Sequence, residues 1–328
     1  MFDNKKILIT GGSGSWGNEI AKQLLRDYNP EQVIIYSRGE QMQVMMDRRF
    51  KSHPKLKFVI GNVQDLETLK EACRGVHYIF YLAALKHVPI CEDNPWQSIK
   101  TNIIGTENVV KTAIANEVEL VLDCSSDKAC NPVNTYGLGK AMGERIMIQA
   151  NHRTNKTKFV CTRAGNAMGT RGSIIPFFKE LIQQGRDVTI TDNRMTRYFM
   201  TIQEAIGLVF KAMQNCKGGE IFVMNMDACK VVDLANIMIK ELGSNSKLTE
   251  IGIRPGEKLH ESLISEHEAS NTIILDDSYY VILPHLNVNG VKEKYKEFKK
   301  FDRSKYTSND VLMGAEEIKE KLRAGGFV

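Results

Sequence analysis

Six short stretches of the chain are almost continuously apolar and rich in β-branched residues, a pattern that predicts strands covered on both faces. They lie at residues 6–11, 32–37, 57–62, 78–84, 118–126 and 158–165. Between them, apolar residues recur with helical spacing at residues 15–27, 65–73, 98–116 and 139–151. Alternating strands and helices of this kind predict the α/β fold class, with a doubly wound parallel sheet.

The alternation changes after residue 166. Three helices are predicted at 174–184, 202–214 and 231–242, with short strands near 187–191 and 220–224. We therefore expect a main domain at 1–166, to which some later segments return, and a smaller substrate-binding lobe at 167–285 over the carboxyl edge of the sheet. A tail segment follows at 286–328, whose mixed-charge stretch 291–306 predicts a solvated segment tied down by its aromatic residues.

Composition and charge fit a soluble globular protein of 328 residues, of which 42% are hydrophobic and 25% charged. The net charge of +5 suits polyanionic small ligands, although a slightly basic surface without functional meaning fits equally well. No basic tract predicts nucleic-acid binding, and no apolar run approaches the roughly 20 residues of a membrane span. The seven cysteines are scattered without a C-x-x-C pair, which predicts reduced thiols and a cytoplasmic location. The histidines do not cluster at metal-ligand spacing, so no metal is expected.

A glycine-rich turn, TGGSGSWG, follows the first predicted strand and opens the first predicted helix. Gly11 permits the tight turn, Gly14 lets a pyrophosphate approach the backbone, and Gly17 allows the helix to pack closely on the strand. The free N–H groups and the positive dipole end of the helix favour phosphate here. We therefore predict a Rossmann-type dinucleotide site. The remaining residues of the predicted cofactor turn are Ser13, Ser15 and Trp16.

The end of the second predicted strand bears on the choice between NAD and NADP. An NAD site places a carboxylate there for the ribose 2′-hydroxyl, whereas this chain has Ser37 and Arg38, which suit a 2′-phosphate. We predict NADP; because Glu40 follows closely, NAD stays open as the alternative. Further cofactor contacts are expected after the third and fourth strands, at Asn62, Val63, Ala83 and Ala84.

Tyr136 and Lys140 lie four residues apart on a predicted helix and therefore on one face of it. We expect a cationic Lys140 to lower the pKa of Tyr136 from about 10, so that the phenolate accepts a hydroxyl proton near neutral pH. The same ammonium can hold the nicotinamide ribose. Ser126, at the end of the preceding predicted strand, completes this candidate set. A second acid–base pair, Asp127-Lys128, stands just upstream, and a simple alcohol dehydrogenase would not need it.

These motifs together resemble the extended short-chain dehydrogenase/reductases and, more narrowly, the UDP-N-acetylglucosamine 4,6-dehydratases of polysaccharide and flagellin-sugar biosynthesis. The similarity covers residues 4–285. Its blocks include ILITGGSGSWG, AALKHVPICEDNP, SSDKACNPVNTYGLGK, RAGNAMGTRGSIIPFF, TDNRMTRYFMT and IRPGEKLHE. The least generic of these features are Asp127-Lys128 and the segment 254–261, which distinguish this group from the superfamily's epimerases and reductases.

The resemblance implies that Tyr136 handles the C4 hydroxyl, while Lys128 and Asp127 act as base and acid for the loss of water across C5–C6. For those roles Lys128 has to be partly neutral and Asp127 partly protonated. Burial favours both states, whereas an ion pair between the two residues opposes them. The expected product is a UDP-4-keto-6-deoxy-N-acetylhexosamine, inverted at C5. Release of the 5,6-unsaturated 4-keto intermediate, or another UDP-sugar epimerase or reductase activity, are the alternatives.

The resemblance also implies contacts to UDP-N-acetylglucosamine, the expected partner. Asn166 resembles the donor to the pyrophosphate, Arg197 and Arg254 resemble phosphate-binding arginines, and Glu257 is placed for the uridine ribose. Lys86 is expected at the mouth of the active site.

Two features concern the sugar pocket and the assembly. Ala164 stands where relatives usually carry an aromatic residue, and with Met168 it predicts a changed wall beside the sugar. Members of the family assemble as dimers or hexamers, which implies a homo-oligomer. The stretch 41–50 predicts the buried face of the second helix, with Arg48 and Arg49 as a candidate oligomer contact.

Overall fold

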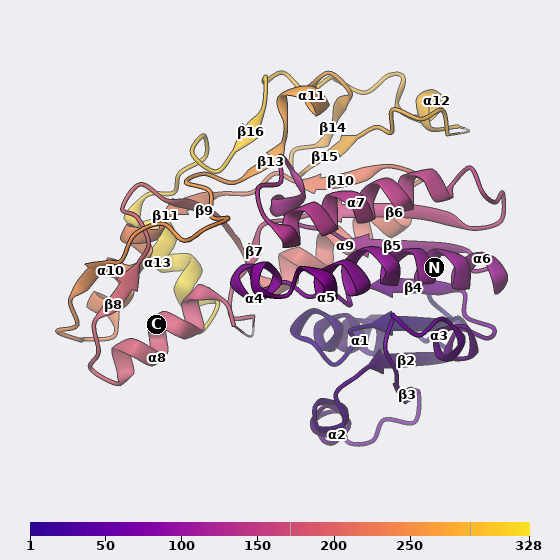
Figure 1. Cartoon of the computed structure of the whole chain (residues 1–328), viewed down its shortest axis with the longest axis horizontal. Coiled ribbons are helices and arrows are strands. Elements are labelled where there is room, and N and C mark those ends of the chain that lie inside the picture. The colour runs from indigo at the N-terminus through magenta and orange to yellow at the C-terminus, as the bar shows by residue number, and fades with distance from the viewer. Residues whose placement is uncertain (171, 289) are drawn as a thin grey trace.

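The computed structural model describes residues 1–170, 172–288 and 290–328. Within them, the main layer is a sheet of nine strands in the order β14–β15–β10–β6–β5–β4–β1–β2–β3 (Figure 1). The strands are β1 (Lys6–Thr10), β2 (Gln32–Ser37), β3 (Leu56–Ile60), β4 (Tyr78–Tyr81), β5 (Leu120–Cys124), β6 (Lys158–Arg163), β10 (Ile221–Met224), β14 (Thr272–Asp276) and β15 (Tyr279–Ile282). The six predicted parallel strands are all present, and the predicted fold class is confirmed.

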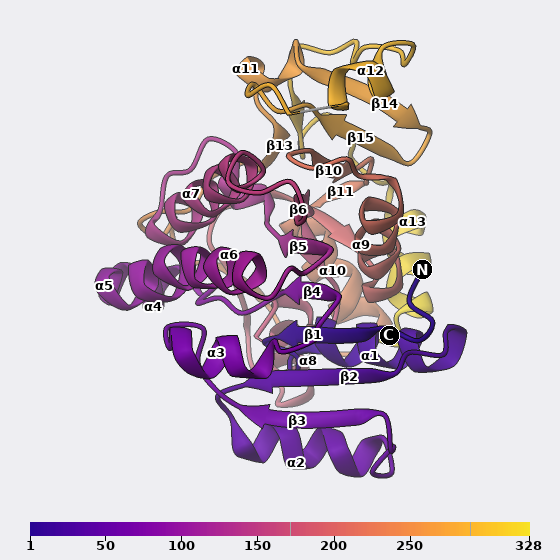
Figure 2. The ribbon, with the colours of Figure 1, turned by 90° about the vertical axis from the view of Figure 1, so that its right-hand side faces the viewer.

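Helices cover both faces of this sheet (Figure 2). On one face, α1 (Ser15–Asp27) packs beside α9 (Ile202–Asn215). On the other, α6 (Gly105–Ala115) lies between α3 (Leu66–Ala72) and α7 (Thr135–Ala150). The strand order reverses between β1 and β4, so the connections leaving these two strands diverge at their carboxyl ends. In open α/β sheets that divergence forms the crevice where ligands bind.

The strand expected near 220–224 and the helix expected at 202–214 are present as β10 and α9, but they belong to the main sheet and not to the smaller lobe, and the hairpin β14–β15 was not predicted. β10 adds parallel to β6, and the antiparallel hairpin β14–β15 then completes that edge. The chain therefore returns twice to the main sheet after residue 166, at 221–224 and 272–282.

The smaller lobe is built from short strands and three helices. Asn166 and Ala167 form β7, which pairs with β9 (Thr196–Met200), and β9 pairs with β11 (Ala228–Lys230). A second short sheet joins β8 (Val188–Ile190) to β12 (Leu248–Glu250), and a third joins β13 (Ser262–Ile264) to β16 (Tyr306–Thr307). The helices of this lobe are α8 (Ile174–Gln183), α10 (Val231–Glu241) and α13 (Ala315–Ala324). The remaining elements are α2 (Glu40–Arg49), α4 (Val88–Asp93), α5 (Pro95–Ile99), the π-helical turn η1 (Lys100–Ile104), the 3₁₀ turn η2 (Asp127–Ala129), α11 (Glu266–Ala269) and α12 (Val291–Tyr295).

The stretch 291–306 agrees with the expectation, because its aromatic residues Tyr295, Phe301 and Tyr306 are buried while most of its other residues are exposed. The expectation for α2 differs from the structure: its apolar residues do not form one buried face, since Met46 is buried but Val44 and Met45 are exposed. Neighbouring apolar positions point to different sides of a helix, and only one side of α2 packs on the sheet.

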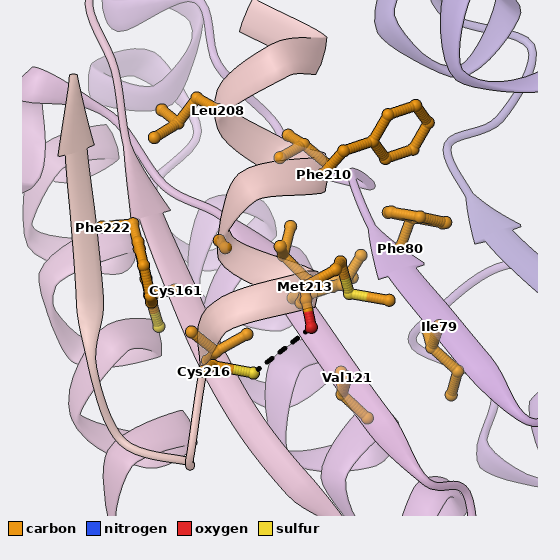
Figure 3. Packing of buried hydrophobic residues seen from close by; sticks show 14 of the residues in the cluster. Ile79, Phe80, Val121, Cys161, Leu208, Phe210, Met213, Cys216 and Phe222 are labelled. Atoms are coloured by element: carbon orange, nitrogen blue, oxygen red, sulfur yellow. Dashed lines mark hydrogen bonds between the residues drawn. The ribbon is translucent and has the colours of Figure 1, made fainter. Parts of the chain in front are cut away.

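The main core lies on both faces of the sheet, and Figure 3 shows the part between α9 and the central strands. Phe210 on α9 packs on Phe80 of β4, with ring centroids 6.1 Å apart, and Met213 lies one turn further on. The Cys216 thiol donates to the Met213 carbonyl oxygen at 3.8 Å, which satisfies the end of the helix. This packing holds strands β4, β5 and β6 in place, and several of the candidate site residues follow their carboxyl ends. Across the described residues, no helix is both long enough and apolar enough to cross a membrane.

Candidate active site

The glycine-rich turn connects β1 to α1 at the crevice. Gly11 has a φ of +65°, and a Cβ at this position would lie 2.9 Å from the Ala83 nitrogen after β4. A Cβ on Gly17 would lie 2.2 Å from the Gly12 carbonyl oxygen. Both sites exclude a side chain, so α1 begins directly beside the carboxyl ends of β1 and β4.

The turn has the features that a dinucleotide phosphate needs. Gly14 is the N-cap of α1, and it provides no side chain to cap the first-turn N–H groups. Backbone donors and the positive helix end therefore face the crevice. Trp16 is partly buried against the core, and Asn18 donates to the Ser13 and Gly14 carbonyl oxygens, which holds the turn in shape. These residues fit a dinucleotide diphosphate.

The end of β2 carries a hydroxyl and an exposed guanidinium. The Ser13 hydroxyl donates to Ser37 Oγ at 3.0 Å, and the Gln43 side-chain amide also donates to Ser37 Oγ at 3.0 Å. Ser37 is thus buried and fixed, while the neighbouring Arg38 is exposed. The two residues lie where the adenine-side ribose of a dinucleotide would be held.

The other predicted cofactor residues surround the same crevice. Asn62 accepts the Tyr36 hydroxyl with its carbonyl oxygen and the Gln64 N–H with its side chain. Val63 is buried against Gly105. Ala83 and Ala84 follow β4 and are partly buried. Their placement at the strand ends agrees with a cofactor floor.

Tyr136 and Lys140 both lie on α7 and are both buried. The Lys140 ammonium donates to Asp123 Oδ1 of β5 at 2.8 Å and lies over the Tyr81 ring, 5.7 Å from its centroid. Burial alone would lower the pKa of Lys140, but Asp123, with smaller contributions from Tyr136 and Tyr81, raises the pKa above its usual value. Lys140 is therefore a cation beside the phenol.

The predicted lowering of the Tyr136 pKa is wrong for the structure as it stands. Burial raises the pKa of Tyr136 above 10, and the charges of Lys140 and Lys128 with the Ser126 hydrogen bond oppose it only in part. The sequence shows the spacing of Tyr136 and Lys140, but it does not show how far water is excluded from the phenol.

The second acid–base pair lies in η2, directly after β5. Lys128 Nζ lies 3.0 Å from Asp127 Oδ1 and 3.5 Å from Glu261 Oε1. The Ser126 hydroxyl donates to Asp127 Oδ1 at 2.7 Å and accepts the Lys128 N–H at 3.2 Å. The ion pair that would oppose the reactive states is therefore present. Burial alone would lower the pKa of Lys128, but the Asp127 and Glu261 carboxylates raise it above its usual value.

Glu261 is a site residue that the sequence reasoning missed. Its side chain is almost fully buried and lies among three cations: Lys128 at 3.5 Å, Lys258 at 3.8 Å and Arg197 at 3.9 Å. It closes the IRPGEKLHE block that had been singled out, so the signal was present. Its partner Lys128 is distant in sequence, and no spacing rule connects them.

The first turn of α7 packs tightly on η2. Asn134 caps α7 by accepting the Gly137 N–H at 2.7 Å, and its amide donates to the Gly256 carbonyl oxygen at 2.8 Å. A Cβ on Gly137 would lie 2.3 Å from the Lys128 carbonyl oxygen. The Lys258 ammonium adds a hydrogen bond to the Cys130 carbonyl oxygen at 2.7 Å. These contacts fasten the 254–261 segment and η2 to the helix that carries Tyr136.

A cavity of about 260 Å³ opens beside the second acid–base pair and is lined by Lys128, whereas the buried Asp127 is not among its described lining residues. Of the predicted substrate residues, Lys86, Asn166, Arg197 and Glu257 line it, together with Lys128 and Glu261. Arg254 is exposed and is not among the described residues that line the cavity; its N–H donates to the Glu257 carboxylate at 3.1 Å. A second cavity, of about 290 Å³, contains none of the predicted site residues in its described lining.

Of the two residues that were expected to change the wall beside the sugar, only one lines the cavity. Met168 lines the cavity, but Ala164 is buried in the main core and is absent from the described lining. The Ala164 carbonyl oxygen accepts the Asp127 N–H at 3.0 Å. Ala164 therefore contacts the site through its backbone, at the N–H of Asp127. Within the described residues, no group of three or more His, Cys, Asp or Glu side chains could hold a metal ion.

Comparison with known proteins agrees with this architecture. The model of the family described as polysaccharide biosynthesis protein matches residues 7–283. A UDP-N-acetylglucosamine 4,6-dehydratase (inverting) from Campylobacter jejuni is 40% identical over 97% of this chain and 96% of its own length. A UDP-glucose 4-epimerase from Rickettsia canadensis is 39% identical over 100% of this chain and 98% of its own. The X-ray structure of Pen from Bacillus thuringiensis superposes with a TM-score of 0.91 at 34% identity, over 98% of this chain and 99% of that one. The chain belongs to the polysaccharide biosynthesis protein family.

Proposed function

We propose that this protein is an NADP-dependent UDP-N-acetylglucosamine 4,6-dehydratase. Relatives named as dehydratase and as epimerase are almost equally similar, so the choice depends on the residues of the site. The observation that carries the proposal is the Asp127–Lys128 pair, fixed by η2 beside Tyr136, with Lys128 lining the substrate cavity. A 4-epimerase needs a proton acceptor for C4 but no second acid and base.

The first step takes place at Tyr136. Tyr136 accepts the proton of the C4 hydroxyl as a phenolate, a form that burial disfavours and that the charges of Lys140, held by Asp123, and Lys128 favour. The bound dinucleotide supplies the acceptor for the C4 hydride and later the donor of a hydride to C6. The 4-ketone that results makes the C5–H acidic, which prepares the second step.

The second step requires a neutral amine and a protonated carboxyl. Transfer of one proton from Lys128 Nζ to Asp127 Oδ1, across 3.0 Å, produces both states and leaves the net charge of the pair unchanged. Lys128 then accepts the C5 proton, and Asp127 donates its proton to the departing C6 hydroxyl, which leaves as water. Exclusion of water by the bound substrate favours the neutral form of the pair. With the hydride that a bound dinucleotide would return to C6, protonation at C5 with inversion would complete the 4-keto-6-deoxy sugar.

The cavity provides the charges for a sugar nucleotide. Arg197 and Lys86 supply cations for the diphosphate, and Asn166 supplies amide donors. The guanidinium of Arg197 is oriented by the carbonyl oxygens of Thr196 and Leu259, at 2.8 and 3.1 Å. Arg254, whose N–H donates to the Glu257 carboxylate, is assigned to the phosphates, and Glu257 to the hydroxyls of the uridine ribose. NADP is favoured over NAD because Arg38 stands exposed where a carboxylate would hold the ribose hydroxyls.

A homo-oligomer, a dimer or hexamer, is part of the proposal. Helices α4, α5 and α7 contact one another and expose large apolar side chains. These are Ile90, Trp96, Val133, Leu138 and Met142, with Val133 just before α7. A patch of this kind on one side of the molecule favours a protein interface. The seven cysteines are free, in keeping with the proposed cytoplasmic location.

The test is proton NMR of the protein with UDP-N-acetylglucosamine in D₂O. A new C6 methyl signal with deuterium at C5 supports dehydration, and the couplings of a reduced derivative report the C5 configuration. Vinyl protons without a methyl signal would mean release of the 5,6-unsaturated intermediate. An epimerised hexosamine, with C5 and C6 unchanged, would overturn the proposal.

A further inference from the structure

Asp123 is a buried carboxylate that the proposed mechanism uses only as a partner of Lys140. It lies in β5, among residues that are otherwise apolar, and none of its surface is exposed. Its Oδ1 atom accepts the Lys140 ammonium at 2.8 Å, and only 5% of the Lys140 side chain is exposed. An isolated carboxylate at such a position would be costly, so the pair is a specific feature of this site.

The second carboxylate oxygen shows that the charge of Asp123 is directed at Lys140. Among the described residues, Asp123 Oδ2 is buried and has no hydrogen-bond partner. The nearby Thr106 hydroxyl is engaged elsewhere, with Tyr81 at 3.1 Å and the Asn102 carbonyl oxygen at 2.7 Å. Burial therefore raises the pKa of Asp123, and Lys140 is the group that opposes this. The titratable groups that act on this cluster are Tyr81, Cys124, Asp127, Lys128, Tyr136, Glu144 and Cys161.

We propose that Asp123 is a positioning residue that holds the Lys140 ammonium beside Tyr136 and sets the pH at which Tyr136 gives up its proton. This inference rests on the proposed function, because it assigns Tyr136 as the acceptor of the C4 hydroxyl proton. Asp123 acts through Lys140 and does not touch the sugar.

The sign of the effect follows from electrostatics. Removing the negative charge of Asp123 makes the loss of a proton from Lys140 or from Tyr136 more favourable. The apparent pKa of the pair falls, so C4 oxidation should begin at a lower pH. The plateau rate should fall as well, because a buried Lys140 without its carboxylate gives up its own proton in part of the molecules. A residue that only filled space would change the rate without moving the pH dependence.

The experiment uses Lys128→Met as the parent, in which elimination is blocked and the reduced nicotinamide accumulates after C4 oxidation. Its absorbance is followed after mixing with NADP and UDP-N-acetylglucosamine across a pH series. Asp123→Asn in this parent should move the acidic limb down by about one pH unit and lower the plateau about tenfold. The matched control is Glu119→Gln, which removes a carboxylate paired with Lys5 just before the same strand and should leave the limb in place.

A second readout needs no ligand. The tyrosinate absorbance of the free protein is titrated with and without Tyr136→Phe, and the difference isolates Tyr136. Asp123→Asn should shift that difference titration to lower pH. If Asp123→Asn does not fold, Asp123→Ser removes the same charge with a smaller polar side chain. If the Tyr136 titration of a folded Asp123 variant does not move, the inference is overturned. If the Lys128→Met parent never reduces the nicotinamide, the proposed function alone is overturned.

Discussion

The buried guanidinium of Arg163 connects the three parts of the chain that hold the site. It lies at the end of β6 and contacts Glu144 of α7 at 2.6 Å and Glu268 of α11 at 2.9 Å. It also donates to the Leu263 carbonyl oxygen of β13 at 2.9 Å. Because β13 directly follows Glu261, this network anchors the segment that carries the partner of Lys128. We predict that Glu268→Gln weakens this network and lowers the free energy of unfolding.

The size of the effect follows from the titration of Glu268. Burial alone would raise its pKa, but the charge and hydrogen bonds of Arg163, with those of Ser265, lower the pKa from 4.5 to about 2. A lowered pKa stabilises the fold above pH 4.5, and this stabilisation is lost as pH falls through 4.5 towards 2. A shift of this size corresponds to about 3 kcal/mol at pH 7. For a chain of this length that is about 5 °C in the unfolding midpoint.

Thermal unfolding of the wild type and of Glu268→Gln at pH 7 and at pH 3 tests the argument. We expect a difference of about 5 °C at pH 7, and more than half of it should disappear at pH 3, where the wild-type carboxylate begins to protonate. Glu266→Gln is the control on the same helix, since its pair with Lys305 is exposed and should contribute less than about 1 kcal/mol. A pH-independent difference would refute the assignment to the Glu268 charge.

Three further predictions concern the reaction. Lys128→Met should lower the rate at which the C6 methyl signal forms by about 10²–10⁴-fold, whereas the absorbance of the reduced nicotinamide in a single turnover should still show C4 oxidation. Loss of both the methyl signal and C4 oxidation would contradict a role of Lys128 limited to C5. Arg38→Ser should weaken binding of NADP about tenfold or more and leave NAD binding unchanged, as measured by fluorescence titration; an equal loss for both would argue against a 2′-phosphate contact. Gly137→Ala places a Cβ against the Lys128 carbonyl oxygen. The substitution should slow elimination about 100-fold and change the rate of C4 oxidation little. Equal slowing of elimination and C4 oxidation would show that α7 itself moves.

Local patterns were enough to predict the parallel sheet and the residues on α7. The apolar stretches became strands, and the four-residue spacing of Tyr136 and Lys140 placed both side chains in one buried site. The hairpin β14–β15 was missed, because it joins the sheet edge more than a hundred residues after the last predicted central strand. A pattern within a short window carries no information about such pairing.

The charges of the site depend on contacts that no short window contains. Asp123 is part of an apolar strand in the sequence, and only the fold shows that it meets Lys140. Glu261 lies far along the chain from Lys128, and only the fold brings their side chains to 3.5 Å. The same holds for the pKa of Tyr136, which burial raises although Lys140 acts in the expected direction and lowers it.

In the proposed mechanism the two lysines of the site need opposite protonation states, although carboxylates contact both of them. Lys140 has to stay protonated to stabilise a phenolate, and its partner Asp123 is buried, fixed in a strand and directed at that ammonium. Lys128 has to lose its proton to accept one from C5, and its nearest partner Asp127 is the group that must gain a proton for the leaving hydroxyl. A single proton transfer prepares both halves of the elimination. Glu261 opposes this transfer by favouring the protonated lysine, but Arg197 and Lys258 share its charge. Arg197, which shares the charge of Glu261, also lines the substrate cavity together with Lys128.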